Sequence, residues 1–230
     1  MLRPFFSFYG SKWRLARHYP EPRHSLIVEP FAGSAGYSLR YPDRDVLLIE
    51  ADDQIAELWR YLITADPADV LALPLVKPGE SIAELDLPAG ARTLIGFWLG
   101  RCRATPARSA STWFRPDRKP GSFWSAATRA RIAAQMPAIR HWRVICADYT
   151  AGDIGSATYF IDPPYERRGT HYRKHSIDFE ALGRWSTRLR GSVIVCEELG
   201  ASWLPFRPLR QAKSQIRGRS YTEAVYLSGF

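Results

Sequence analysis

Short apolar runs that each end in a carboxylate limit the fold of this chain more than any other feature. Residues 25–29 have the sequence SLIVE, residues 45–50 have the sequence DVLLIE, and loop residues bound both runs. Runs this short and this apolar are typical of strands that are buried in a parallel sheet. Further runs predict four more strands, at 142–147, 159–161, 192–196 and 224–227.

Helical patterns separate these runs. After Glu50, apolar residues recur at helical spacing at Ile55, Leu58, Trp59 and Leu62. Residues 179–189 form another helical stretch, and we also expect a short helix between the first two strands. Strands that alternate with helices predict an α/β fold with a doubly wound, mostly parallel sheet.

The stretch from 66 to 143 departs from this alternation. It has prolines at 67, 74, 78, 88, 106, 116, 120 and 137, and helical patterns around 94–101 and 122–135. Eleven basic residues and a single acid, Asp117, lie between positions 92 and 143. We therefore predict that residues 1–65 and 144–230 form the α/β domain, and that residues 66–143 form a helical, basic insertion.

The composition is that of a globular protein. Of the 230 residues, 46% are hydrophobic and 24% charged, which excludes a disordered or fibrous chain. The three cysteines, Cys102, Cys146 and Cys196, are far apart and lack metal-ligand spacing, so we predict neither a disulfide framework nor a metal site. No run approaches the roughly 18 apolar residues that a membrane helix needs. We expect a reducing, cytoplasmic location and no membrane partner.

The positive charge of the chain is concentrated in the insertion. The net charge is +9, and the window from 92 to 143 alone carries more than that. Aromatic residues are interleaved with this charge, a mixture suited to holding phosphates and stacking on bases; they include Phe97, Trp98, Trp113, Phe114, Phe123, Trp124 and Trp142. The window favours a nucleic-acid partner. A solvated basic face over an aromatic core is the alternative.

The first chemical motif is the sequence EPFAGSAG at 29–36. It follows the first predicted strand, at the edge where open α/β sheets bind ligands, and its glycines allow a close approach of the backbone. It is neither GxGxxG nor a P-loop. Glu50, which ends the second strand, can accept hydrogen bonds from the ribose of a nucleoside-containing cofactor. A tight turn and a surface glutamate would also explain this pair.

The second motif is the sequence YFIDPPY at 159–165, an apolar strand followed by a carboxylate, two prolines and an aromatic ring. An exocyclic aromatic amine is a poor nucleophile because its lone pair is delocalised into the ring. Asp162 and the Pro163 carbonyl can accept its two N–H bonds, which directs the lone pair toward an electrophile. The prolines stiffen the backbone, and Tyr165 offers a face on which a base rotated out of a duplex can stack.

With these motifs in this order, the sequence resembles the adenine-specific DNA methyltransferases of the Dam type, at both ends of the chain and in the order of the motifs between them. The sequence FYGSK at 8–12 is similar to the family's N-terminal aromatic-x-Gly-x-Lys segment, and residues 29–36 are similar to its glycine motif. Residues 162–165 match the catalytic tetrapeptide. The insertion departs from the family's target-recognition region, because it is short and lacks an obvious hairpin, and residues 196–198 differ from the small polar residues expected there.

The resemblance implies a Rossmann-like methyltransferase fold, with S-adenosylmethionine bound by residues 1–65 and 144–230. The implied cofactor-binding residues, of which Lys12 holds the cofactor carboxylate and Phe31 lies near the cofactor adenine, are Phe8, Tyr9, Lys12, Phe31, Gly33, Glu50, Asp148, Tyr149 and Asp162. The implied catalytic residues are Asp162, Pro163, Pro164 and Tyr165. The methyl group passes directly to the N6 amine of a flipped adenine, without a metal and without a covalent enzyme intermediate.

The expected macromolecular partner is DNA. Residues 66–143 form the target-recognition region in this interpretation, with Arg115, Arg118 and Lys119 on phosphates. Four basic residues follow the tetrapeptide and are expected to hold the phosphates that flank the flipped base, although a solvated loop would explain them equally: Arg167, Arg168, Arg173 and Lys174. The protein would then be nucleoid-associated when bound to DNA. A monomer is compatible with the sequence, as are roles in restriction-modification, phage defence or regulation.

Three other functions remain open from the sequence. Methylation of cytosine N4 uses the same amine geometry. An RNA or protein-glutamine methyltransferase can carry a related tetrapeptide. A DNA-binding protein can keep the methyltransferase fold without activity, although Lys12, Glu50 and Asp162 are all present in this chain.

Overall fold

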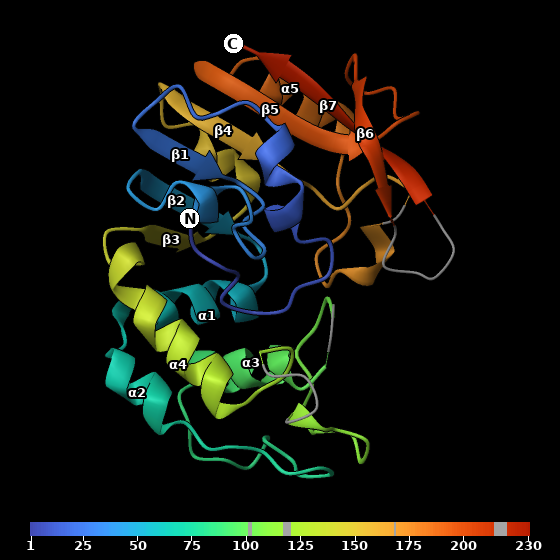
Figure 1. The fold of residues 1–230 in the computed structure, drawn as a ribbon. Helices are drawn as coiled ribbons and strands as arrows, with labels where there is room; N and C mark the ends of the chain where they lie inside the picture. Colours follow the sequence, from blue (N-terminus) through green and yellow to red (C-terminus); the bar gives the residue numbers. More distant parts are fainter. Residues whose placement is uncertain (101–102, 117–120, 168, 214–219) are drawn as a thin grey trace.

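One mixed sheet organises the protein. The computed structural model describes residues 1–100, 103–116, 121–167, 169–213 and 220–230. The sheet has the order β3-β2-β1-β4-β5-β7-β6 (Figure 1). Its strands are β1 (Leu26–Glu29), β2 (Asp45–Glu50), β3 (Arg143–Cys146), β4 (Ala157–Ile161), β5 (Gly191–Glu198), β6 (Arg207–Lys213) and β7 (Ser220–Ser228). All neighbouring pairs among β1 to β5 are parallel, whereas β7 is antiparallel to both β5 and β6. The predicted doubly wound, mostly parallel sheet is confirmed.

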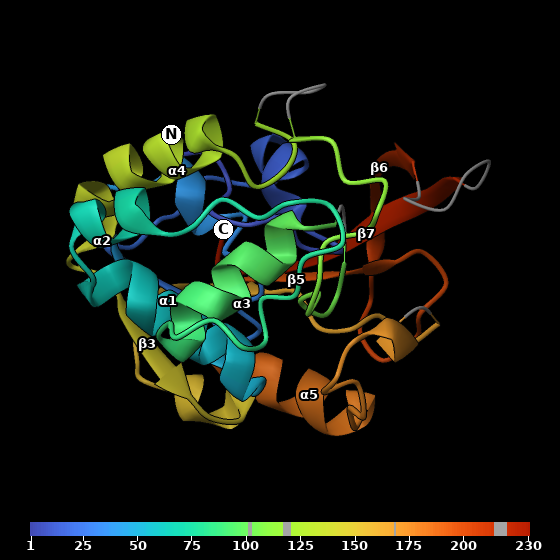
Figure 2. The ribbon, with the colours of Figure 1, turned by 90° about the horizontal axis from the view of Figure 1, so that it is seen from below.

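The α-helices occupy two places around this sheet. Four of them lie between β2 and β3 in the chain: α1 (Asp53–Thr64), α2 (Pro67–Ala72), α3 (Ala89–Trp98) and α4 (Ala126–Gln135). They are grouped beyond β3, away from β5, β6 and β7 (Figure 1). The remaining helix, α5 (Phe179–Ser186), precedes β5. Seen from below, α5 lies on the opposite side of the molecule from α4 (Figure 2).

Alternating side chains of the central strands fill two separate cores. Ile27 and Phe160 pack in one core with α1, α3 and α4, whereas Val28 and Tyr159 pack in the other core with Leu182 of α5. This alternation follows from the pleat, which points successive side chains to opposite faces. Both faces of the central strands are covered, as the continuous apolar runs predict.

Two local expectations from the sequence are wrong. The segment between β1 and β2 contains the 3-10 turn η3 (Ser38–Arg40) in place of the expected helix. Pro30, Gly33 and Gly36 leave too few helix-forming residues in this short connection. Strand β6 was not expected either, because Pro208 and the charged side chains around it conceal an alternating pattern.

The helices of residues 66–143 share their core with the sheet. Leu94 of α3 and Ile132 of α4 belong to the same buried cluster as Leu48 of β2. The division into a catalytic domain and an inserted recognition region stays a prediction. No helix in the described ranges is long and apolar enough to cross a membrane.

The strand order creates a crevice between β1 and β4. From β1 the chain proceeds outward to β2 and β3, and it then returns to β4 on the other side of β1. In open α/β sheets, ligands bind at the carboxyl ends of two strands related in this way. The glycine motif follows β1 and Asp162 follows β4, so both motifs lie at this crevice.

Candidate active site

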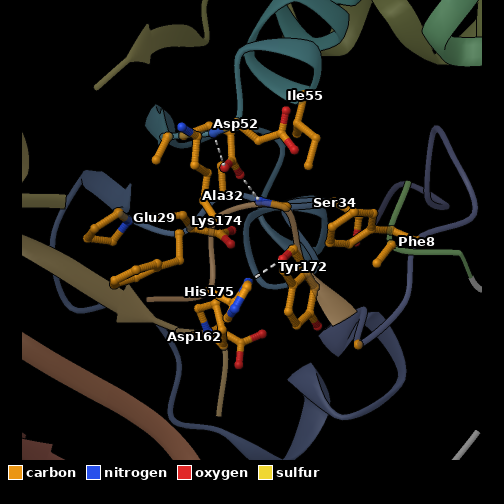
Figure 3. A pocket seen from close by; sticks show the side chains of 18 of the residues that line it. Phe8, Glu29, Ala32, Ser34, Asp52, Ile55, Asp162, Tyr172, Lys174 and His175 are labelled. Atoms are coloured by element: carbon orange, nitrogen blue, oxygen red, sulfur yellow. Dashed lines mark hydrogen bonds between the residues drawn. The ribbon is translucent and has the colours of Figure 1, made fainter. Parts of the chain in front are cut away.

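A cavity of about 320 Å³ lies at the carboxyl ends of β1, β2 and β4. Figure 3 shows Asp52 and Ile55 on one side of this first cavity and Asp162 on the opposite side. Every residue that the sequence assigned to cofactor binding contributes to its lining, namely Phe8, Tyr9, Lys12, Phe31, Gly33, Glu50, Asp148, Tyr149 and Asp162. The volume falls within the range of about 300 to 1,000 Å³ that is usual for small-ligand sites.

The glycine motif folds back onto the end of β2. Gly33 has a φ angle of +43°, a left-handed conformation that glycine adopts without strain. Its N–H donates to Glu50 Oε2 over 2.9 Å, and its carbonyl accepts from Trp59 Nε1 over 2.7 Å. A Cβ atom at Gly36 would lie 2.6 Å from the backbone nitrogen of Trp13. The two glycines therefore let the turn pack against both α1 and the N-terminal segment.

Glu50 is a buried acid whose two carboxylate oxygens both accept hydrogen bonds from backbone N–H groups. Its Oε1 accepts the N–H of Asp52 and its Oε2 accepts the N–H of Gly33, each over 2.9 Å. Burial raises the pKa of Glu50 to about 7, and these two hydrogen bonds oppose that rise. Each carboxylate oxygen keeps a further lone pair, so Glu50 can also accept hydroxyl groups of a ligand.

Two aromatic rings form a flat wall of the first cavity. Phe31 and Tyr149 stack with centroids 5.4 Å apart and an interplanar angle of 23°. Asp148 lies beside them and caps the 3-10 turn η6 (Tyr149–Gly152), where its Oδ1 accepts the N–H of Thr150 over 3.0 Å. A flat apolar wall next to an acid suits a heteroaromatic ring that carries N–H groups.

Asp162 forms an ion pair with Lys12 at the inner end of the first cavity. The Lys12 Nζ atom lies 2.7 Å from Asp162 Oδ1, and Lys12 is only 6% exposed. Burial raises the pKa of Asp162 to about 6, and the Lys12 charge limits the rise. Burial alone would lower the pKa of Lys12, but Asp162 and Glu223 raise it above its ordinary value. Lys12 is therefore protonated and favours the ionised form of Asp162.

Glu223 joins this ion pair from β7, and the sequence analysis missed it. This fully buried carboxylate accepts two phenolic hydroxyl groups on Oε1, from Tyr165 over 2.5 Å and from Tyr19 over 2.6 Å. Its Oε1 also lies 3.9 Å from Lys12 Nζ. Glu223 thus links Tyr165, one of the predicted catalytic residues, to Lys12. The sequence offered no local signal, because Glu223 reaches the site only through the antiparallel pairing of β7.

A second cavity of about 470 Å³ adjoins the first and shares Lys12 and Asp162 with it. Pro163 and Tyr165 line this second cavity, whereas Pro164 lines the first. The residues shared by both cavities are Tyr9, Gly10, Ser11, Lys12, Asp162 and Tyr172. Asp162 therefore faces both cavities, and the four predicted catalytic residues are divided between them.

The segment from Tyr172 to Ile177 lines part of the first cavity, and its residues were also missed except for Arg173 and Lys174. The Tyr172 hydroxyl donates to the Tyr9 carbonyl over 3.3 Å. Arg173 forms ion pairs with Asp52 and Asp53 at the start of α1, 3.1 Å from Asp53 Oδ1. The structure therefore places Arg173 at the first cavity, and the phosphate contact expected for it stays a prediction.

Several basic residues of the insertion donate into the protein itself. Arg115 Nη1 donates to the carbonyls of Thr112 and Phe114. Backbone carbonyls also accept from the guanidinium groups of Arg92, Arg103, Arg129, Arg131 and Arg140. Outside the insertion, Arg167 donates to the Gly200 carbonyl over 3.3 Å. Arg118, Lys119 and Arg168 lie outside the described residues. The expected DNA contacts of all these residues stay predictions.

Neither metal ligands nor a disulfide are found in the part of the chain that the structure describes. No group of His, Cys, Asp and Glu residues there can hold a metal ion. Cys146 is an exposed thiol and Cys196 a buried one, while Cys102 lies outside the described residues.

Comparisons with known proteins give similarity to solved structures alone. No protein-family model matches the sequence. No curated protein matches it either. Among solved structures, yhhF of Escherichia coli, which carries a provisional methyltransferase name, aligns at 12% identity over 87% of this chain and 73% of its own, with a TM-score of 0.37. A conserved hypothetical protein of Streptococcus pyogenes aligns at 10% identity over 87% of this chain and 84% of its own, with a TM-score of 0.36.

Proposed function

We propose that the protein is an S-adenosylmethionine-dependent DNA methyltransferase that acts on the N6 amine of an adenine rotated out of the duplex. The observation that carries this proposal is the position of Asp162 between two cavities. One cavity joins a glycine turn, a ribose-binding acid and an aromatic wall, and the other contains Tyr165. A methyl donor and an acceptor base can thus approach the same carboxylate from opposite sides.

The lining of the first cavity fits S-adenosylmethionine. Glu50 would accept the ribose hydroxyls, and the wall of Phe31 and Tyr149 would contact the adenine ring, with Asp148 beside it. Gly33 brings the backbone close to the ligand. When bound, S-adenosylmethionine supplies an electrophilic methyl group on a positively charged sulfur, and the acids of this cavity favour such a cation.

Asp162 and the Pro163 carbonyl would accept the two N–H bonds of the target amine. This orients the nitrogen lone pair toward the methyl group and stabilises the positive charge that develops on nitrogen. The N–C bond forms as the C–S bond breaks, the electron pair stays on sulfur, and the amine then releases a proton toward the Asp162 carboxylate. Lys12 keeps Asp162 ionised before the reaction, so the acceptor is already charged when the amine arrives.

Tyr165 supports a nucleobase as the methyl acceptor. Its ring lines the second cavity, and its hydroxyl is fixed by Glu223. A ring held in this way offers a rigid surface on which a flipped base can stack. Adenine is favoured over cytosine by the resemblance to the Dam-type enzymes.

The test combines a binding measurement with product analysis. Calorimetric titration of the purified protein with S-adenosylmethionine is expected to show one site, and titration with NADH none. Incubation with labelled S-adenosylmethionine and duplex DNA, followed by hydrolysis to nucleosides and mass spectrometry, is expected to yield N6-methyladenine. Asp153→Ala serves as a matched control for Asp162→Ala, because Asp153 is an exposed acid that lines neither cavity.

The outcomes separate this proposal from its alternatives. N4-methylcytosine in the hydrolysate would make cytosine the substrate. Labelled RNA or protein in parallel incubations, with unlabelled DNA, would change the substrate class. Tight binding of DNA without binding of S-adenosylmethionine would leave a DNA-binding protein on this fold.

A further inference from the structure

The mouth of the second cavity carries a cluster of guanidinium groups that the sequence analysis did not single out. Arg14 lies in the 3-10 turn η1 (Lys12–Arg14), Arg17 lies in the 3-10 turn η2 (Ala16–His18), and Arg210 lies in β6. All three side chains are exposed and line the cavity. Asp162 is the only carboxylate among the described residues of this lining.

Two of these arginines, Arg17 and Arg210, meet at His18. Arg17 and Arg210 both contact the Nε2 atom of His18. A ring nitrogen that accepts from guanidinium groups carries no proton, so His18 is neutral and leaves the two positive charges uncompensated. Within the described ranges, no ion pair joins Arg14, Arg17 or Arg210 to an acid. Such a cluster is unfavourable in the free protein and becomes favourable when anions bind there.

The basic residues of the insertion differ in this respect. Arg92, Arg129 and Arg140 point their donors at backbone carbonyls, which fixes loops and helix ends. Their charge still contributes to the long-range field, but the donors engaged in these bonds are not directed at a ligand. Arg14 and Arg210 line a cavity that Asp162 and Tyr165 also line, and no bond of either guanidinium group to a backbone carbonyl is found in the described residues.

The geometry of a flipped nucleotide determines where its neighbouring phosphates must lie. A base that rotates out of a duplex stays linked through its sugar to two phosphates, so these phosphates must lie at the mouth of whichever cavity holds the base. We infer that Arg14, Arg17 and Arg210 form the surface that binds the DNA phosphates on either side of the target nucleotide. This inference rests on the proposed function, because it assumes that the base enters the second cavity.

The experiment compares three triple variants that each remove three positive charges. The first is Arg14→Gln, Arg17→Gln and Arg210→Gln, at the mouth. The second is Arg115→Gln, Arg118→Gln and Lys119→Gln, in the insertion. The third is a charge-matched control, Arg44→Gln, Arg188→Gln and Arg190→Gln, whose exposed residues lie near the amino ends of strands, opposite the cavities. Binding of a fluorescent DNA duplex is measured by anisotropy from about 50 to 200 mM salt.

The mouth variant is expected to flatten the plot of log affinity against log salt by about one unit per arginine, roughly three in total. The loss is expected to be equal for all DNA sequences, since phosphate contacts do not distinguish bases. Its melting temperature and its affinity for S-adenosylmethionine should match the wild type, because the first cavity is unchanged. The control variant is expected to change the slope much less.

Four outcomes would overturn the inference: an unchanged slope for the mouth variant, an equal change in the control, a change confined to the insertion variant, or tighter binding of duplex RNA than of DNA. Failure of the proposed function is separate, because it appears as the absence of N6-methyladenine in the wild-type reaction. The salt slopes still decide the inference in that case.

Discussion

The two cavities that meet at Lys12 and Asp162 differ in the balance of charge in their linings. The first cavity has both signs: it is lined by the acids Glu29, Glu50, Asp52, Asp148 and Asp162 and by the bases Lys12, Arg173 and Lys174, and Arg173 is paired with an acid. The second is lined by arginines, and Asp162 is its only described acid. The first therefore suits a cation that carries hydroxyl groups, and the second suits a polyanion.

The difference shows how one carboxylate can serve two ligands. In the proposed function, a cationic methyl donor and a nucleic acid must approach within bonding distance. The cation is stabilised by acidic residues around it, and the polyanionic nucleic acid is stabilised by basic residues. The ion pair of Lys12 and Asp162 lies where the two environments meet. Changes on one side should therefore affect mainly one ligand, whereas a change to Asp162, which lines both cavities, should affect chiefly the reaction between them.

The largest expected effect comes from replacing Asp162, which lines both cavities. Asp162→Ala removes the acceptor that orients the amine, and we expect the rate of methyl transfer to fall by about a hundredfold or more. Binding of S-adenosylmethionine and of DNA, measured by calorimetry and anisotropy, should persist. Asp162→Asn keeps the shape but loses the charge, and it should show a smaller loss than Asp162→Ala. Near-normal turnover by a folded Asp162→Ala protein would contradict the mechanism.

A substitution in the first cavity should weaken cofactor binding without weakening DNA binding. Glu50→Ala removes a charged acceptor, and we expect a loss of about 2 kcal/mol, roughly thirtyfold in the affinity for S-adenosylmethionine. DNA affinity should stay within a few-fold of the wild type. Glu57→Ala is the control, because Glu57 is an exposed acid on the neighbouring helix α1. Equal weakening of both ligands by Glu50→Ala in a protein of normal melting temperature would remove the distinction between the cavities.

A substitution in the second cavity should weaken DNA binding without weakening cofactor binding. Tyr165→Ala removes the ring on which the base stacks, and we expect DNA affinity to fall by about tenfold. Affinity for S-adenosylmethionine should be unchanged. Tyr165→Phe keeps the ring and loses only the hydrogen bond to Glu223, so its DNA affinity should be closer to the wild type. If Phe and Ala weakened DNA binding equally, the hydroxyl rather than the ring would carry the effect.

The smallest expected effect is in the pH dependence of kcat/KM for DNA. Ionised Asp162 accepts the amine hydrogens, and burial places its pKa at about 6. The activity should therefore be about half its plateau at pH 6 and should fall roughly tenfold for each further unit of acid. Lys12→Met removes the positive charge that limits the pKa of Asp162. This variant should therefore lose activity at a higher pH than the wild type does. If activity fell at the same pH in this variant and in the wild type, a group other than Asp162 would control the pH dependence.

The sequence could bring Glu50 and Asp162 to one edge of the fold because both belong to local patterns. Glu50 and Asp162 each end an apolar strand, and parallel strands bring their carboxyl ends to one edge. The chain therefore needs only the correct strand order for these residues to meet. Phe8, Lys12 and Tyr149 could be assigned only through the resemblance to a family, since no spacing rule connects them to the sheet.

The second cavity could not be predicted in the same way. Glu223 and Arg210 lie on β7 and β6, whose antiparallel pairing sets which side chains reach the site. The count of arginines also leaves open what each guanidinium group contacts. A sequence shows how many guanidinium groups a segment has, but not that the donors of Arg92 or Arg140 reach carbonyls of the same chain.

The hydrogen bond from Tyr19 to Glu223 has a consequence for synthesis of the protein, because it joins residues 204 positions apart. At ribosomal rates of about 5 to 20 residues per second, Tyr19 and Lys12 wait roughly 10 to 40 seconds before Glu223 is made. Most of the sheet and the glycine turn can form during that interval, and with them much of the first cavity. The contacts of Glu223 with Tyr19, Tyr165 and Lys12 are thus among the last that the chain can form.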